Sequence, residues 1–122
     1  MKHVEIDKIK QNCSNDRVML LELINIGIKR IDGCHDEINK ALSEEEWDEL
    51  ARIVHKLRPI LFFCGITSLD KELQSIERDS KARVGLADMP DKLAYLYSNM
   101  QEAGQELDAL KDEINRDEGT DK

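Results

Sequence analysis

Residues 43–65, SEEEWDELARIVHKLRPILFFCG, decide the fold class, because their apolar side chains recur every three or four positions. That spacing is typical of one face of an α-helix. The apolar stripe consists of Trp47, Leu50, Val54, Leu57, Leu61 and Cys64. A serine followed three positions later by a glutamate has the pattern of a capping box. We therefore predict a helix over residues 44–64, with Ser43 as its N-cap and Glu46 reaching back to it.

Three further stretches show helical periodicity, whereas the alternation typical of strands never persists. We predict a helix over residues 15–42 that Ser14 caps, two more over residues 68–79 and 91–114, and a loop over residues 80–90. The other connections are short, and short connections place successive helices antiparallel. The sequence therefore predicts an all-α fold, an antiparallel up-down four-helix bundle.

The two ends of the chain differ in apolar content. Near the start, Val4, Ile6 and Ile9 permit a short extra N-terminal helix. At the other end, the stretch NRDEGTDK is polar and carries no apolar stripe. We therefore predict one bundle domain over residues 1–114 and a frayed polar tail over residues 115–122.

The composition of the 122 residues, 40% hydrophobic and 36% charged, suits a single helical domain. A net charge of -8 without a long basic cluster argues against nucleic acid and an anionic membrane surface as partners. No apolar stretch reaches the ~18 residues of a membrane span. The opening MKHVEIDKIKQN lacks the apolar core of a signal peptide, so we expect a cytoplasmic protein. Cys13, Cys34 and Cys64 have no metal-site spacing and are expected to be free, buried thiols.

His55 is the candidate functional residue, because it belongs to a second stripe that lies one step around the helix from the apolar stripe. This second stripe is Ala51, His55, Arg58, Phe62 and Gly65. It predicts His55 exposed beside the core, with Arg52, Lys56 and Arg58 around it. The ordinary alternative is a solvated helix face whose cations pair with acidic neighbours. A basic cluster on an acidic chain, beside exposed aromatic bulk at Phe62, favours a functional role.

Residues 51–77, ARIVHKLRPILFFCGITSLDKELQSIE, resemble the signature of the histidine phosphotransfer (HPt) family. That signature has a histidine, an aliphatic residue two positions on, a lysine three on, a glycine four on and a second glycine ten on. The corresponding residues here are His55, Leu57, Arg58, Pro59 and Gly65. Trp47 and the small residue Ala51 resemble the family's usual approach to the histidine. The order of predicted elements matches the family over residues 15–114.

Two positions depart from the signature. Arg58 replaces the lysine and keeps its positive charge, and the planar guanidinium can still hydrogen-bond phosphoryl oxygens. Pro59 replaces the first glycine, and a proline inside a helix lacks the N–H that would bond the carbonyl of His55. We therefore predict a kink near residues 55–59, or another partner for that carbonyl.

The resemblance implies a phosphocarrier that accepts a phosphoryl group on His55 from a receiver-domain aspartate and passes it to another receiver. Arg58 and Lys56 are implied to stabilise the phosphoryl oxygens. The residues implied to contact the partner are Arg52, Phe62 and Gly65, and Gly65 is implied to leave space for a partner loop. The implied partners are receiver domains and a hybrid sensor histidine kinase. The resemblance also implies that the receiver holds Mg²⁺ and that this chain holds no cofactor. It further implies that the chain is a monomer. The chain carries no Walker motif, Gly-rich phosphate loop or kinase signature, so no ATP-dependent kinase activity is expected.

Two other functions stay open. A helical-bundle adaptor would bind proteins without moving phosphate, which the changes at Arg58 and Pro59 allow. A metal-binding bundle would need inward carboxylates, and the predicted apolar stripes contain none. His35, at a core position, is expected to be a partly buried structural histidine with a polar partner, and His3 in the terminus carries no functional prediction.

Overall fold

A computed structural model describes the backbone of residues 1–120 and the side chains of residues 1–116. The elements, in chain order, are α1 (Ile6–Asn12), α2 (Arg17–Ser43), α3 (Trp47–Phe63), α4 (Asp70–Ala82), the 3₁₀ helix η1 (Leu86–Asp88) and α5 (Met89–Thr120). The described residues contain no strand, only an isolated antiparallel bridge between Val4 and Ile66. The all-α fold and the short N-terminal helix are therefore confirmed. Within the described part of the chain, no helix has the length and apolar character needed to cross a bilayer.

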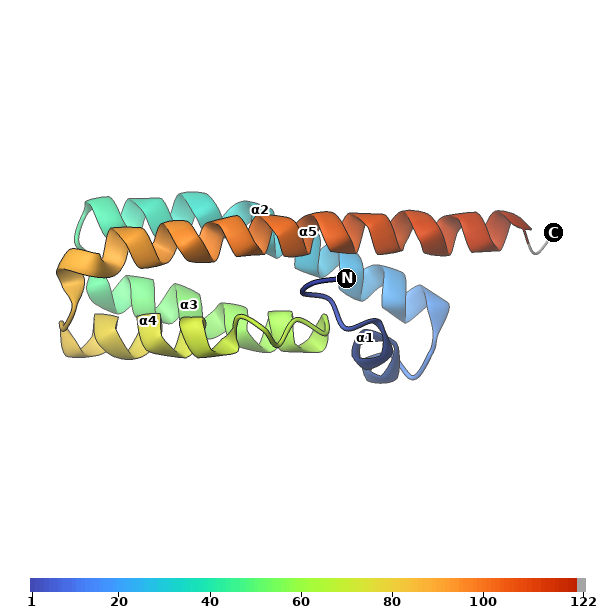
Figure 1. Ribbon diagram of the computed structural model, residues 1–122, viewed down its shortest axis with the longest axis horizontal. Coiled ribbons are helices and arrows are strands. Elements are labelled where there is room, and N and C mark those ends of the chain that lie inside the picture. Colours follow the sequence, from blue (N-terminus) through green and yellow to red (C-terminus); the bar gives the residue numbers. More distant parts are fainter. Residues whose placement is uncertain (121–122) are drawn as a thin grey trace.

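The four long helices lie side by side along the length of the molecule (Figure 1). α3 packs against α2 and α4, and α5 packs against the same two helices, so that each long helix contacts two others. One apolar core fills the space between them, and its fully buried members include Ile24, Leu50, Leu57, Leu61, Leu73, Ile76, Leu96 and Met100. The short α1 contacts α3. The result is a helical bundle with an additional N-terminal helix.

The turn between α2 and α3 is longer than predicted. The predicted capping box is wrong, because Ser43 is the last residue of α2 and its hydroxyl donates to the carbonyl of Lys40 at 3.1 Å. The turn that follows places Glu45 in the left-handed region with a φ of 55°. α3 therefore begins at Trp47 instead of Glu44.

Other helix ends are also displaced from their predicted positions. Asp16, not Ser14, caps α2 by accepting a hydrogen bond from a first-turn backbone N–H at 3.0 Å. α4 extends to Ala82, inside the predicted loop. α5 continues to Thr120, past its predicted end at residue 114, and the fraying of the polar tail stays a prediction. Residues 121–122 lie outside the described part of the chain.

α3 buries its predicted apolar stripe and continues through the proline. Leu50, Val54, Leu57 and Leu61 are buried, and Trp47 is half-buried. Pro59 is exposed inside the helix, which continues without interruption to Phe63. Because proline has no N–H, the carbonyl of His55 receives no helical hydrogen bond from this position. The kink near this proline stays a prediction.

All three cysteines are free and buried, as predicted. Burial raises the pKa of Cys34 and that of Cys64 to about 11. A thiol with so high a pKa is almost entirely protonated at neutral pH and is a poor nucleophile. These thiols therefore serve the packing of the core.

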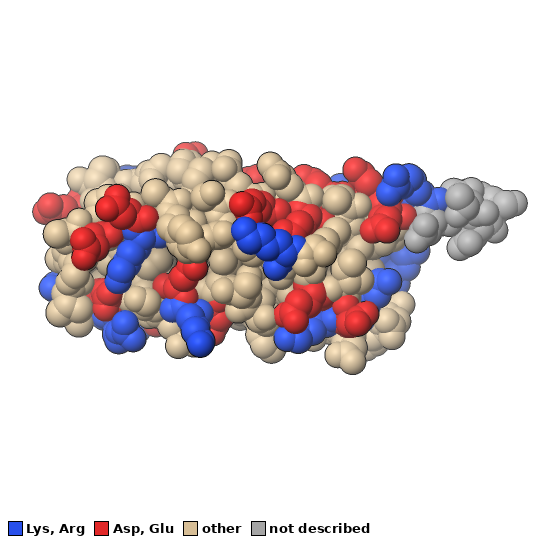
Figure 2. Space-filling view, in the orientation of Figure 1, with Lys and Arg blue, Asp and Glu red and all other residues tan. Residues whose placement is uncertain are grey.

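An ion pair joins α4 to α5 through a buried carboxylate. Lys92 Nζ lies 2.7 Å from Asp79 Oδ2, and this hydrogen bond holds the pKa of Asp79 below its ordinary value of 3.8. A carboxylate with a lowered pKa stabilises the fold above its ordinary pKa, and this stabilisation is lost as the pH falls through the lowered value. Acidic and basic side chains are interspersed over the face drawn in Figure 2.

We expect Asp79→Asn to lower the free energy of unfolding at neutral pH and to matter less in acid. The difference from wild type should shrink below about pH 4, because wild-type Asp79 is then being protonated and loses its charge as well. Urea denaturation at about pH 7 and about pH 3 measures this difference. Asp36→Asn, at an exposed position on α2, is the control and should give a small difference at both values. An Asp79→Asn difference that is the same at both values contradicts the role of the ion pair.

Candidate functional site

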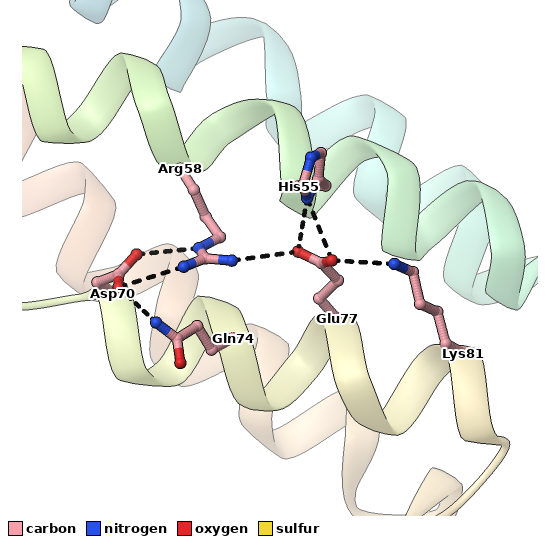
Figure 3. A network of polar contacts seen from close by, with 6 residues as sticks. All are labelled: His55, Arg58, Asp70, Gln74, Glu77 and Lys81. Carbon is pink, nitrogen blue, oxygen red and sulfur yellow. Dashed lines mark hydrogen bonds and ion pairs between the residues drawn. The ribbon is translucent and has the colours of Figure 1, made fainter.

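His55 lies on α3 with its imidazole directed toward α4 (Figure 3). Its side chain is 65% exposed, which confirms the predicted exposure beside the core. Nδ1 lies 3.1 Å from both carboxylate oxygens of Glu77, a residue of α4. Because a carboxylate only accepts hydrogen bonds, this contact places a proton on Nδ1. The neutral ring then keeps a free lone pair on Nε2.

Glu77 is the centre of the polar network drawn in Figure 3. Its side chain is only 12% exposed, and it also accepts a hydrogen bond from Lys81 Nζ at 3.1 Å. Burial alone would raise the pKa of Glu77, but the hydrogen bonds from Lys81 and His55 outweigh it and hold the pKa below its ordinary value. Glu77 is therefore an anion beside the histidine at neutral pH.

Arg58 ties α3 to the start of α4. Its Nε donates to Asp70 Oδ1 at 3.0 Å and its Nη2 to Asp70 Oδ2 at 3.5 Å, while Nη1 lies 3.7 Å from Glu77 Oε1. Gln74 donates to the same Asp70 carboxylate at 2.7 Å. The hydrogen bond from Arg58 lowers the pKa of Asp70. Arg58 is thus on the same face as His55, as predicted, but most of its guanidinium edge is already engaged.

In the described part of the chain, His55 forms no hydrogen bond or ion pair with Lys56 or Arg52. Arg52 forms an ion pair with Glu49 of its own helix, through both Nε and Nη2. Lys56 is exposed, and its charge helps to lower the pKa of Glu49, although the hydrogen bond from Arg52 is the larger cause. The predicted basic cluster is therefore divided: Arg58 faces α4, and the other two cations act on Glu49.

Two phenylalanines at the end of α3 form an exposed apolar surface. Phe62 is 59% exposed and Phe63 is 51% exposed, with their rings edge to face and their centroids 5.9 Å apart. Phe62 lies on the same stripe of α3 as His55 and Arg58. Its predicted exposure is confirmed, and its contact with a partner stays a prediction.

Gly65 is packed against the chain's own N-terminal segment, and its role toward a partner stays a prediction. The residue is buried, and a Cβ atom built on it would lie 2.7 Å from the carbonyl oxygen of Glu5. Its φ of +75° is a conformation that glycine adopts without strain. The chain's own N-terminal segment therefore lies directly against Gly65.

The other two histidines have structural surroundings. His35 stacks on Tyr97 with ring centroids 3.7 Å apart, and its Nε2 lies 3.1 Å from the side-chain amide nitrogen of Asn39, so the predicted polar partner is confirmed. His3 is 4% exposed, which the sequence did not indicate. Among the described residues, no group of three or more potential ligands could hold a metal ion.

The sequence did not single out Asp70 and Glu77, the two acidic residues that complete the site. A signal was present in the predicted third helix. Its polar residues recur at intervals of four and three at Asp70, Gln74 and Glu77, which places them on one helix face. That face is the one that α4 presents to His55 and Arg58 (Figure 3).

Comparison with protein-family models finds no match, and comparisons with the curated proteins and with the solved structures find none either.

Proposed function

We propose that this chain is a phosphorelay phosphocarrier that accepts a phosphoryl group on Nε2 of His55. The donor is the aspartyl phosphate of a receiver domain, and the acceptor is the aspartate of another receiver. One observation carries the proposal: an exposed imidazole has its Nδ1 held by the carboxylate of Glu77, 3.1 Å away. That contact leaves Nε2 as the nucleophilic nitrogen.

The transfer step balances without an additional base. The Nε2 lone pair of the neutral ring attacks phosphorus, a bond forms between nitrogen and phosphorus, and the bond from phosphorus to the aspartyl oxygen breaks. The donor aspartate leaves as a carboxylate, and the ring becomes positively charged with its proton still on Nδ1. Glu77 faces that proton and stabilises the charge. Return of the phosphoryl group to a second receiver reverses these steps.

The cations of α3 and α4 support the same chemistry. Arg58, Arg78 and Lys81 border an open depression between the two helices, next to Glu77. Their charges favour the approach of a phosphoryl group to an otherwise acidic chain. Mg²⁺ belongs to the receiver in this proposal, because the carboxylates of a receiver would hold it.

The proposed function also implies a particular arrangement of the four long helices. We infer that α2 to α5 form an antiparallel up-down four-helix bundle. The contacts of each long helix with two others and the short turns between them support this arrangement. The monomeric state, the cytoplasmic location and the partnership with a hybrid sensor histidine kinase also stay predictions.

A second function, a protein–protein adaptor without phosphotransfer, is favoured by one observation. The exposed pair Phe62 and Phe63 provides apolar area suited to a binding partner, whatever the chemistry at His55. A single assay distinguishes the two functions. An adaptor would bind a receiver without acquiring phosphate.

The test is phosphoryl transfer from a panel of receiver domains that have been phosphorylated with acetyl phosphate in the presence of Mg²⁺. We expect the chain to acquire phosphate that is labile in acid and stable in alkali, as a phosphoramidate is, and peptide mapping should locate it on His55. Binding without labelling across the panel would support the adaptor instead.

Arg58→Ala should slow the transfer about tenfold, which corresponds to about 1.4 kcal/mol of transition-state stabilisation. The loss of its ion pair with Asp70 should cost at most about 1 kcal/mol of folding stability, because these side chains are 30% and 42% exposed. Arg58→Lys keeps the charge and should recover part of the rate. Single-turnover kinetics and urea denaturation give the two values. An unchanged rate, or a loss of several kcal/mol of stability, would contradict this role.

A further inference from the structure

The third residue of the chain is buried and makes side-chain contacts with two distant segments. His3 Nδ1 lies 2.9 Å from the hydroxyl of Ser68, which precedes α4, and His3 Nε2 lies 2.9 Å from a carboxylate oxygen of Glu102 on α5. The backbone N–H groups of His3 and Val4 both donate to Glu106 Oε1, at 2.8 Å and 2.9 Å. A chain terminus is ordinarily mobile unless it is tied down, and these contacts tie this one down.

The next residues attach the terminus to the connection between α3 and α4. Val4 pairs with Ile66 in the isolated bridge, and the backbone N–H of Glu5 donates to the carbonyl of Gly65 at 2.9 Å. Thr67 donates its hydroxyl to the carboxylate of Glu5 at 2.6 Å. We call His3–Glu5 the N-terminal strap. It lies between α5 and the α3–α4 connection (Figure 1).

The hydrogen bonds of the His3 ring can form whether the ring is neutral or protonated. With a neutral ring, Nε2–H donates to Glu102 and Nδ1 accepts from the hydroxyl of Ser68. With a protonated ring, Nδ1–H donates to the same hydroxyl oxygen, because a serine hydroxyl both donates and accepts. Both ring nitrogens of His3 are therefore satisfied in either state.

The segment under the strap leads directly into the site. Residues 64–69 join the end of α3 to Asp70, which accepts hydrogen bonds from Arg58, and the same guanidinium lies 3.7 Å from Glu77. We infer that the N-terminal strap positions Glu77 against His55, by fixing the connection from which α4 begins. His3 is thus a positioning residue that acts through the connection and through α4. The inference rests on the proposed function for the importance of the His55–Glu77 contact, but its test needs no phosphate.

Two variants of the full chain release the strap in different ways. His3→Ala removes the ring between Ser68 and Glu102, and Glu106→Ala removes the acceptor of two backbone N–H groups. In each variant we expect amide hydrogen exchange across residues 65–68 to become faster by about tenfold or more. We also expect fewer His55 rings to carry the proton on Nδ1, as read from ring ¹⁵N chemical shifts under conditions in which the ring is neutral.

The matched control is His35→Ala, which removes the histidine that stacks on Tyr97, away from the strap. It should leave both measurements at their wild-type values. Faster exchange with an unchanged His55 tautomer would overturn the inference, because the strap would then hold the connection without positioning Glu77. Equal changes in His35→Ala would overturn it too, since they would indicate general loosening of the bundle. If the wild type accepts no phosphate but the tautomer still responds to the strap variants, the proposed function fails and this inference stands.

Discussion

Replacing His55 with Gln should abolish phosphoryl acceptance, because no other side chain in the site offers a neutral nitrogen with a free lone pair. Glutamine presents an amide, whose nitrogen is not nucleophilic toward phosphorus. The side chain of His55 is 65% exposed, so the fold should be affected little, within about 0.5 kcal/mol. Labelling from phosphorylated receivers, followed by urea denaturation of the same sample, gives both results.

The control for this prediction is His35→Gln. His35 stacks on Tyr97 and borders α5, whereas His55 faces α4, so the two histidines lie on different faces of the bundle. His35→Gln should retain labelling. If His55→Gln were labelled at the wild-type rate, the phosphoryl group would be accepted by a residue other than His55. The proposed function would then lose its basis.

The exposure of His55 could be predicted because it depends on local geometry alone. The apolar residues of α3 recur at helical spacing, and they fix which face of the helix is buried. The angular offset of His55 from Val54 and Leu57 then places the imidazole beside the core. No knowledge of the neighbouring helices is required for that step.

The contact between His55 and Glu77 could not be predicted in the same way, because it depends on how α3 and α4 dock. Spacing along α4 shows which polar residues share a face, but it does not show which of them meets the histidine. The engagement of Arg58 by Asp70 has the same origin. A sequence signature assigns the cation to the phosphoryl group, whereas the fold also uses it to join two helices.

The positions of the helix ends also could not be predicted from sequence spacing alone. Ser43 and Glu46 have the spacing of a capping box, yet the chain forms a turn there with Glu45 in the left-handed region. Caps contribute only about 1 kcal/mol, so the packing of α2 and α3 decides where the turn falls. The extension of α5 to Thr120 likewise follows no apolar signal in the sequence.

Gly65→Ala should destabilise the protein strongly. Alanine at a φ of +75° costs about 1–3 kcal/mol from backbone strain alone. In addition, its Cβ atom would lie 2.7 Å from the carbonyl oxygen of Glu5 and 3.2 Å from the backbone nitrogen of Ile9. Both are backbone atoms that cannot turn aside as a flexible side chain can, so the strap or α1 must move away from the end of α3.

Gly33→Ala is the matched control, because Gly33 is exposed on α2 and a Cβ atom there meets nothing within 4 Å. At this helical position alanine should stabilise the protein by about 1 kcal/mol. Urea denaturation of both variants should therefore give shifts of opposite sign. If Gly65 instead provided room for a partner, its alanine variant would keep wild-type stability and lose only transfer. A stable Gly65→Ala protein with slow transfer would restore the role that the resemblance implied, and an unstable one would assign this glycine to the attachment of the N-terminal segment.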